Sequence, residues 1–421
     1  MTSFKPKKWF LLPPGAAPEV RLVFWVRGLR AFGDGHVSLI LPFYLSILGL
    51  DPFFVGLIAT ASLLGSGVLT LGVGLVANRF RLRSLLLAAT VMTVATGAGY
   101  AVFTDFWPLL IIATIGTLNP AMGHSAMYLP LEHTLLASTI DDRNRTPIFA
   151  RYSLIGTFLA ALGSLAAGAP QALVAATPLD MKEALQAMFW LYGAIGLLTV
   201  LIYRRIPPGS APVREKRPPP LTRSRRIVFM LAALFSLDSL GGGFVVQSLV
   251  ALWLFQRFGF QPAAVGTIFF WVTLLGALSQ LVAGPIARRI GLVKTMVFTH
   301  LPGNLLLIAV PFMPNAGLAV ALLMARAALN QIDVPARNSY VMAVVRSEER
   351  PAAMSFTTVP RGLVAAVGPL VAGYLLSVSG FGWPLVIGGG LMGLYDLLLL
   401  KMFHAVRPPE EKTDDADPTD S

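Results

Sequence analysis

The chain has 421 residues, of which 55% are hydrophobic and 13% are charged, and its mean hydropathy is +0.69. This composition lies outside the range of soluble globular domains and indicates a polytopic membrane protein. The sequence contains no cysteine, which excludes disulfides, thiolate metal sites and thiol nucleophiles. The formal net charge of +12 does not indicate nucleic-acid binding, because the basic residues lie in short loops and no nucleic-acid motif accompanies them.

Twelve apolar stretches of membrane-spanning length follow one another along the chain. A transmembrane helix needs roughly 20 largely apolar residues. These runs are too long and unbroken for the alternating strands of a membrane β-barrel. The sequence therefore predicts an all-α integral membrane fold with twelve transmembrane helices. The predicted spans are 20–48, 53–77, 84–103, 107–136, 148–174, 184–203, 227–255, 263–287, 293–312, 318–345, 352–378 and 383–403.

Lys and Arg gather on alternate connections between these spans. The positive-inside rule then places both termini in the cytoplasm, which requires an even number of spans. The longest basic connection is rich in proline and divides the chain into halves. We expect a cytoplasmic tail over 1–19, a six-helix bundle over 20–206, a basic linker over 207–226, a second six-helix bundle over 227–406 and an acidic, disordered tail over 407–421.

The two halves repeat a common pattern of glycine, proline and arginine. With an offset of 210, Gly49, Pro52, Gly56, Gly74, Ala77 and Arg79 match Gly259, Pro262, Gly266, Gly284, Ala287 and Arg289. With an offset of 205, Pro130, Arg145, Gly163 and Gly168 match Pro335, Arg350, Gly368 and Gly373. Glycine and proline recur in all membrane helices, but the matching arginines in loops favour a true internal repeat.

Two six-helix halves joined by a long basic loop resemble the major facilitator superfamily over nearly the whole chain. That family carries a signature, roughly Gly-x-x-x-Asp-Arg-x-Gly-Arg-Arg, after spans two and eight. Its glycine and arginine positions persist here, whereas Asn78 and Arg288 replace the acidic residue, so the usual charge contact is absent or rearranged. The resemblance implies a gating loop formed by Gly74, Asn78, Arg79, Arg83, Gly284, Arg288 and Arg289.

A subtype of the family, the drug and proton antiporters, carries a glycine-proline pattern in span five. Here Gly163 and Gly168 occupy span five without the proline, and Gly368-Pro369 occurs in span eleven instead. The sequence therefore resembles this efflux subtype only in part.

Ionisable residues concentrate on spans one, four, seven and ten, with others on five and eleven. Charges inside a bilayer are costly and therefore indicate partners or function. The resemblance implies that spans one, four, seven and ten line a central cavity. The predicted carriers of a proton or cation are Asp34, Asp238, Asp333 and Glu132. The residues expected at the substrate cavity are Arg30, His36, His124, Tyr128, Arg326, Asn330, Arg337 and Arg361.

Structural alternatives stay open at these positions. Asp333 and Arg337 are one helical turn apart and form either an ion pair or a transport site. Arg30 lies one turn from Asp34 and is a possible partner that neutralises it. Glu132 lies near the cytoplasmic end of span four and Arg151 near the same end of span five, where a structural pair or snorkelling of the side chains is expected.

Backbone features near these charges give further expectations. The triplet at 241–243, after Asp238, consists of glycines and predicts a locally unwound segment. Pro130 and Pro335 predict kinks within spans four and ten. His300 and Asp396 are expected to be isolated on peripheral helices.

These features predict a secondary transporter that moves a small molecule through the lipid bilayer, coupled to protons and without a cofactor. We expect a monomer in the cell (inner) membrane, with efflux of drugs or metabolites as one option for its direction. The alternatives are an uncoupled carrier or exchanger of an organic anion, because six arginines approach the cavity helices, and a non-transporting receptor or lipid-binding protein. An enzyme is not expected, because the sequence has no histidine pair at metal-ligand spacing, no nucleophile elbow and no P-loop.

Overall fold

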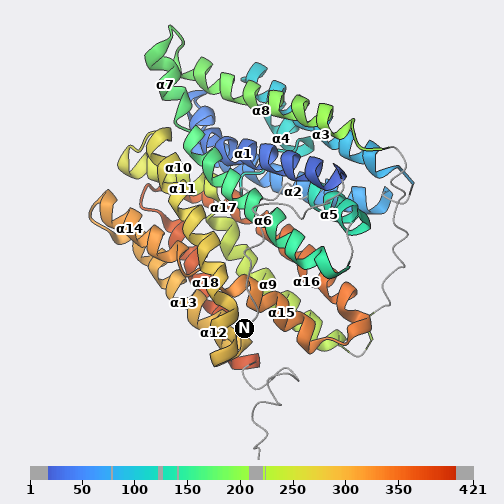
Figure 1. The fold of residues 1–421 in the computed structure, drawn as a ribbon. Helices are drawn as coiled ribbons and strands as arrows, with labels where there is room; N and C mark the ends of the chain where they lie inside the picture. The colour runs from blue at the N-terminus through green and yellow to red at the C-terminus, as the bar shows by residue number, and fades with distance from the viewer. Residues whose placement is uncertain are drawn as a thin grey trace, which may run out of the picture.

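The computed structural model describes residues 18–76, 79–121, 127–139, 142–207, 221–222 and 224–403. Within these residues every regular element is a helix, as Figure 1 shows. The first half of the chain forms α1 (Pro18–Ile47), α2 (Pro52–Val76), α3 (Leu82–Val102), α4 (Phe106–Ile115), α5 (Tyr128–Thr139), α6 (Asp142–Ala166), α7 (Ala169–Ala176) and α8 (Met181–Tyr203).

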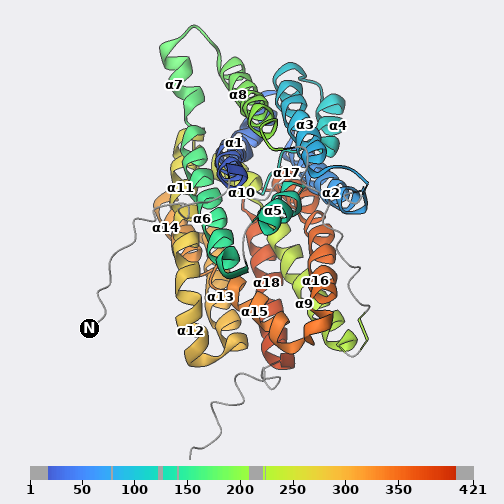
Figure 2. The same cartoon turned by 45° about the vertical axis from the view of Figure 1, so that its right-hand side comes forward.

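The second half continues from the segment at 221–224. It forms α9 (Arg225–Phe244), α10 (Gln247–Phe258), α11 (Pro262–Ser279), α12 (Ala283–Ile290), α13 (Leu292–Ala309), α14 (Ala316–Ala327), α15 (Asp333–Val344), α16 (Arg350–Ala365), α17 (Gly368–Val378) and α18 (Trp383–Phe403). Short 3₁₀ turns at Gln280–Val282, Val310–Phe312 and Ser347–Glu349 link or extend these helices. In Figure 2 the two halves occupy separate regions, blue to green and yellow to red.

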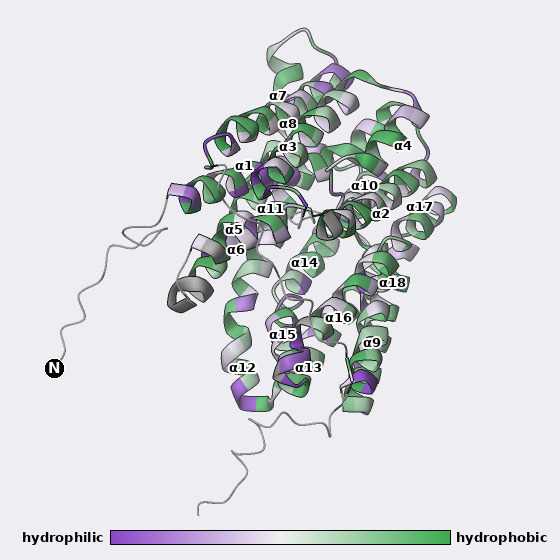
Figure 3. Ribbon diagram, turned by 90° about the vertical axis from the view of Figure 1, so that its right-hand side faces the viewer, coloured by the Kyte–Doolittle hydropathy of each residue, from purple (hydrophilic) through white to green (hydrophobic). Residues whose placement is uncertain are grey.

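Nine helical segments in the described residues are long and apolar enough to cross a membrane. The helix α1 is 30 residues long but carries Arg27, Arg30 and Asp34, and it is not among the nine. Many large apolar side chains point outward, and Trp107 and Leu281 are 70% and 72% exposed. Figure 3 shows that mainly hydrophobic residues run along the helices, with hydrophilic residues at the lower ends of α9 and α12. Such a surface is suited to lipid.

The predicted spans four and ten are each broken into two helices, which corrects the expectation of continuous spans. Span four stops at Ile115 and resumes at Tyr128, and span ten stops at Ala327 and resumes at Asp333. Pro130 and Pro335 do not kink these spans, because each is the third residue of its helix, α5 or α15. The first-turn N–H groups have no intrahelical acceptor, so proline costs little there.

The first residues of equivalent helices in the two halves are related by the offsets of the internal repeat. The helices α5 and α15 are both 12 residues long, and their first residues differ by the same 205 positions as their prolines. The helices α2 and α11 begin at Pro52 and Pro262, which the offset of 210 relates. The same offset relates the first residues of α3 and α13.

Equivalent contacts join the two halves along α2 with α17 and along α6 with α11. A Cβ on Gly56 would overlap the carbonyl oxygen of Pro369, and a Cβ on Gly266 would overlap that of Ser164. Gly56 is related to Gly266 by the offset of 210, and Ser164 to Pro369 by the offset of 205. The repeat therefore produces two matching helix crossings in which glycine permits close backbone approach.

Buried apolar side chains form three clusters that show how the halves are joined. One cluster includes residues of both halves, among them Leu39, Phe189, Trp253 and Leu376. A second lies entirely in the first half, in α1, α3, α5, α6 and α8. A third lies entirely in the second half, in α9, α13, α15, α16 and α18. The halves thus share one hydrophobic core near the crossings and have separate cores at the other end.

The glycine triplet after Asp238 is helical, which corrects the expectation of an unwound segment. The helix α9 continues to Phe244, so the break from α10 falls after the triplet. A Cβ on Gly241 would lie 2.7 Å from the carbonyl oxygen of Gly388, and one on Gly243 would overlap the backbone of Ala365. These glycines therefore allow α18 and α16 to pack closely on α9.

Candidate functional site

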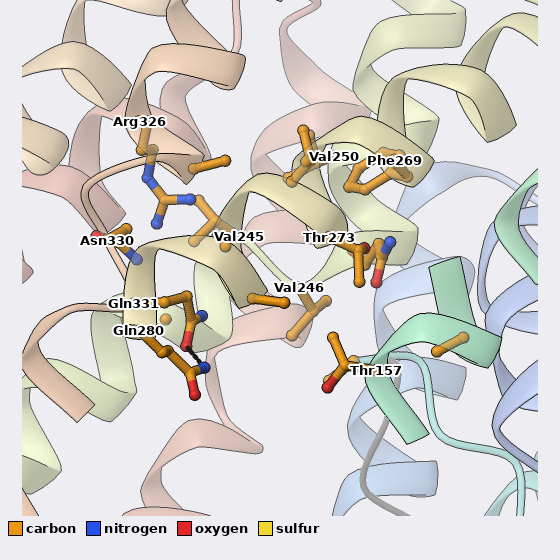
Figure 4. A pocket seen from close by; sticks show the side chains of 18 of the residues that line it. Thr157, Val245, Val246, Val250, Phe269, Thr273, Gln280, Arg326, Asn330 and Gln331 are labelled. Carbon is orange, nitrogen blue, oxygen red and sulfur yellow. Dashed lines mark hydrogen bonds between the residues drawn. The ribbon is translucent and has the colours of Figure 1, made fainter. Parts of the chain in front are cut away.

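A cavity of about 470 Å³ lies between the two halves. Its volume is within the range of roughly 300–1,000 Å³ that is usual for small-molecule sites. The first half contributes residues of α1, α5 and α6, and the second half contributes residues of α9, α10, α11, α13 and α14. Figure 4 shows the side chains around it. A site shared by both halves changes shape when the halves move relative to each other.

One wall of the cavity is polar and is formed where α14 ends. Arg326, Asn330 and Gln331 lie together there, beside Gln280 (Figure 4). Gln280 Nε2 donates to Gln331 Oε1 at 3.4 Å. Because span ten is broken at this place, side chains of its irregular segment reach the cavity.

Two glycines on neighbouring helices make room for this segment. A Cβ on Gly303 of α13 would lie 3.3 Å from Asn330 Oδ1 and 3.8 Å from Arg326 Cγ. A Cβ on Gly276 of α11 would lie 3.2 Å from Gln331 Cγ. The polar wall thus depends on small residues in the helices behind it.

The rest of the second-half wall is largely apolar. Val250 and Phe269 face the cavity opposite the polar group, with Val245 and Val246 between them (Figure 4). The apolar residues that line the cavity from this half are Val245, Val246, Val250, Ile268, Phe269, Val272, Leu307 and Leu323. The second-half wall therefore combines the polar group at the end of α14 with a mainly apolar part that also contains Gln247 and Thr273.

Next to the cavity, the second half contains a buried network of charged residues. Arg337 Nη1 on α15 donates to Asp238 Oδ2 on α9 at 2.9 Å and lies 3.4 Å from Asp333 Oδ2 one turn earlier. Arg361 on α16 is 3.8 Å from Asp238 and donates from Nε to Ser239 Oγ at 3.0 Å. The structure thus pairs Asp333 with Arg337, one of the two alternatives from the sequence, and pairs Arg361 with Asp238.

The network extends to His300 and Asp396, which corrects the expectation that these residues are isolated. His300 Nδ1 is 3.0 Å from Asp396 Oδ1, and His300 Nε2 is 3.9 Å from Asp238 Oδ1. Asn304 Nδ2 donates to Asp396 Oδ2 at 2.9 Å. His300 and Asn304 share one face of α13 at i, i+4 spacing, but their partner lies on α18, and spacing within one helix does not reveal it.

A second buried network lies inside the first half. Arg30 Nη2 donates to Glu132 Oε1 at 2.5 Å, and both side chains are almost fully buried. Glu132 also accepts hydrogen bonds from the hydroxyls of Tyr152 and Tyr203. The Arg30 guanidinium lies over the Tyr128 ring, with Cζ 3.6 Å from its centroid. Arg30 and Glu132 therefore pair with each other across the first half.

Asp34 and His36 also point into the first half. Asp34 is 2% exposed and accepts a hydrogen bond from the Tyr192 hydroxyl at 3.4 Å. The ring nitrogens of His36 lie 3.1 Å from the carbonyl oxygen of Phe32 and 3.3 Å from that of Met188. Asp34, His36, Arg30 and Tyr128 are absent from the described cavity lining, whereas Arg326 and Asn330 belong to it. His124 lies outside the described residues.

The predicted gating residues lie around the connection from α2 to α3 and, in the second copy, on α12. Arg83 donates from Nη2 to the carbonyl oxygen of Arg204 at 2.8 Å, at the end of α8. Arg79 is exposed, and Gly74 lies in the last part of α2. In the second copy Gly284, Arg288 and Arg289 are exposed on α12. Asn78 lies outside the described residues.

The sequence profile of the Major Facilitator Superfamily matches residues 23–329 and 231–419. The chain belongs to the Major Facilitator Superfamily. A relative in Saccharomyces cerevisiae, described as an uncharacterized membrane protein, is 22% identical over 93% of this chain and 95% of its own length.

Solved transporter structures share the superfamily fold. The nucleoside transporter NupG has a TM-score of 0.73 at 13% identity, over 91% of this chain and 100% of that chain. A bacterial homologue of the iron transporter ferroportin, in an inward-facing state, also has a TM-score of 0.73 at 13% identity, over 91% and 98%. The human organic anion transporter TETRAN has a TM-score of 0.60 at 20% identity, over 91% and 100%. Membership of this superfamily supports a multi-pass membrane protein that transports small molecules.

Proposed function

We propose that this protein is a secondary active transporter that moves a small molecule by alternating access, coupled to protons. Twelve spans cross the membrane with both termini in the cytoplasm, and breaks in the fourth and tenth spans place irregular backbone within the bilayer. The protein works as a monomer in the cell (inner) membrane. Efflux of drugs or metabolites is one direction of this cycle and uptake is the other.

The arrangement of the three apolar clusters carries the proposal. The halves share a core where α2 crosses α17 and α6 crosses α11, and they have separate cores elsewhere. Two rigid bundles with one shared contact region can rock about the cavity between them. A transporter needs this freedom in order to expose its site to each side of the membrane in turn.

The loop charges support an inward-facing assignment for this conformation. The matching crossings involve Pro52 and Ala263, which follow loops that contain few basic residues. The separate cores lie nearer to Arg79, between α2 and α3, and to Arg289 at the end of α12. By the positive-inside rule the joined end faces away from the cytoplasm.

The charge count of the second-half network supports proton coupling. It contains the carboxylates of Asp238, Asp333 and Asp396 and the guanidiniums of Arg337 and Arg361. With His300 neutral, the ionised network has one excess negative charge, and one proton makes it neutral. A buried excess charge is costly, so this network favours uptake of a proton. Here the predicted carriers Asp238 and Asp333 act together with His300, whereas Asp34 and Glu132 are held inside the first half.

The proposal is tested with purified protein in vesicles that enclose a pH indicator. We expect a substrate-dependent proton flux that Asp238→Asn abolishes. The control variant Asp105→Asn changes an exposed acid in a loop and keeps the flux. Solute movement without proton movement would identify an uncoupled carrier or exchanger, and binding without any movement would identify a receptor.

A further inference from the structure

We propose that the cavity binds an amphipathic organic anion whose negative group is held by Arg326. This inference rests on the proposed transport function and names the class of substrate. It is carried by the charges that line the cavity, by the hydrogen-bonding state of Arg326 and by the division of the cavity into polar and apolar parts.

The cavity lining carries positive charge and no acidic side chain among the described residues. Arg326 comes from the second half and Arg27 from the first half. Both guanidiniums stay protonated in proteins. A positively charged cavity within a bilayer is costly to keep without an anion. A cationic substrate would add to this charge, whereas an anionic one would neutralise it.

The Arg326 side chain makes no hydrogen bond or ion pair within the described part of the chain, and its Nε is buried without an acceptor. The Asp238 carboxylate interacts electrostatically with the Arg326 guanidinium. That carboxylate already receives the hydrogen bond from Arg337 at 2.9 Å and has Arg361 at 3.8 Å. Arg326 can therefore direct its donors to a ligand, and a guanidinium suits the two oxygens of a carboxylate, sulfonate or phosphate.

Other polar atoms of the cavity lining are also unpaired. Asn330 Oδ1 and Gln247 Nε2 are buried without hydrogen-bond partners, and both residues line the cavity. Leaving such groups unpaired costs free energy that a polar ligand group can recover. Val250 and Phe269 also line the cavity, and they suit the apolar body of a ligand (Figure 4). The ligand thus has an anionic head and an aromatic or aliphatic body.

The test compares probes that share a body and differ only in the head group. Purified protein in detergent is titrated with indoleacetate, indoleacetamide and tryptamine, and with the matching acetate, acetamide and ethylamine of naphthalene. We expect at least one of the acetates to bind and its amide and amine to bind at least about ten-fold more weakly, because only the acetate forms charge-assisted hydrogen bonds.

Variants locate the site within the cavity. Arg326→Gln is expected to weaken acetate binding by roughly ten-fold to a hundred-fold, and Arg326→Lys by less. Arg257→Gln removes an exposed positive charge at the end of α10 and leaves binding unchanged. Size-exclusion chromatography checks that each variant is folded. If Arg326→Gln does not fold, the anion site is still tested by Arg326→Lys and by the head-group comparison in the unchanged protein.

The inference is overturned if an amide or amine binds as tightly as its acetate, if Arg326→Gln binds the acetate undiminished, or if neither acetate binds. Because binding is measured without vesicles, the two proposals fail separately. Anion binding without flux would contradict the transport function but would support the anion site. Proton-coupled flux of a cation that is unchanged in Arg326→Gln would contradict the anion site but would support the transport function.

Discussion

Gly56 of α2 and Gly373 of α17 meet backbone to backbone, so that a Cβ on either glycine would lie 2.8 Å from the Cα of the other. The equivalent crossing in the repeat joins Gly266 of α11 to Ser164 of α6. These two crossings join the halves at one end of the molecule. Their tightness makes them sensitive to the smallest side chain.

Gly373→Ala is expected to force α2 and α17 apart and to weaken the joined end. Overpacking of this kind costs about 1–3 kcal/mol. We expect a lower melting temperature and slower transport, and the same from Gly266→Ala. The control is Gly390→Ala on α18, where a Cβ meets nothing within 4 Å. Equal melting temperatures for all three variants would show that the crossings do not constrain the halves.

Glu132→Gln is expected to destabilise the first half, because it leaves the Arg30 guanidinium buried without a counter-charge. Breaking a buried pair by removing one partner costs about 3–5 kcal/mol. The double variant Arg30→Gln, Glu132→Gln should recover part of this loss. Thermal unfolding measures both, with the exposed Glu348→Gln as a control. If Glu132→Gln keeps full stability and loses only proton flux, Glu132 is a coupling residue instead.

Asp396→Asn is expected to abolish substrate-driven proton movement while the protein still binds substrate. The change removes the carboxylate that holds His300 and leaves the remaining network neutral without an added proton. Proton flux and substrate binding are measured on the same vesicle preparation, with Asp105→Asn as a control. Proton flux that survives in Asp396→Asn would place the coupling proton on another residue.

The proposed orientation can be tested by labelling, because the sequence contains no cysteine and any introduced one is the sole thiol. Arg257→Cys and Arg289→Cys both replace exposed arginines, at the ends of α10 and α12. We expect a membrane-impermeant maleimide to label Arg257→Cys in intact cells. Arg289→Cys should react only after the membrane is permeabilised. The reverse pattern would invert the orientation.

Hydropathy and the repeat predicted most of the helices, since both depend on residues that are near in sequence or related by a fixed offset. The breaks in spans four and ten were not predicted, because apolar residues continue through them and hydropathy does not register a backbone turn. Pro130 and Pro335 lie close to the two breaks, but each stands in the first turn of a new helix and does not kink a continuous one. The glycines at 241–243 were misread for a related reason, since glycine serves close packing as well as unwinding.

The site was predicted less completely, because charge pairs join helices that are distant in the chain. The residues predicted for the cavity included Arg326 and Asn330, which line it. The pairing of Asp333 with Arg337 followed from helical spacing, since both lie on α15. The partners of Glu132 and His300 lie on other helices, and spacing carries no information about them. Asp34 and His36 lie on α1, which also contributes to the cavity, yet their side chains contact residues of α8 within the first half.

The pairing of Arg30 with Glu132 has a consequence for biogenesis. The chain emerges from the ribosome from its N-terminus, and the two residues are 102 positions apart. While α1 is alone in the membrane, Arg27, Arg30 and Asp34 make its insertion unfavourable, at about 2.5–3.5 kcal/mol for each charge near the centre. Stable insertion of α1 across the bilayer is therefore expected only after α5, which carries Glu132, has been synthesised. The helices of the first half are thus expected to insert together, after α5 has been synthesised.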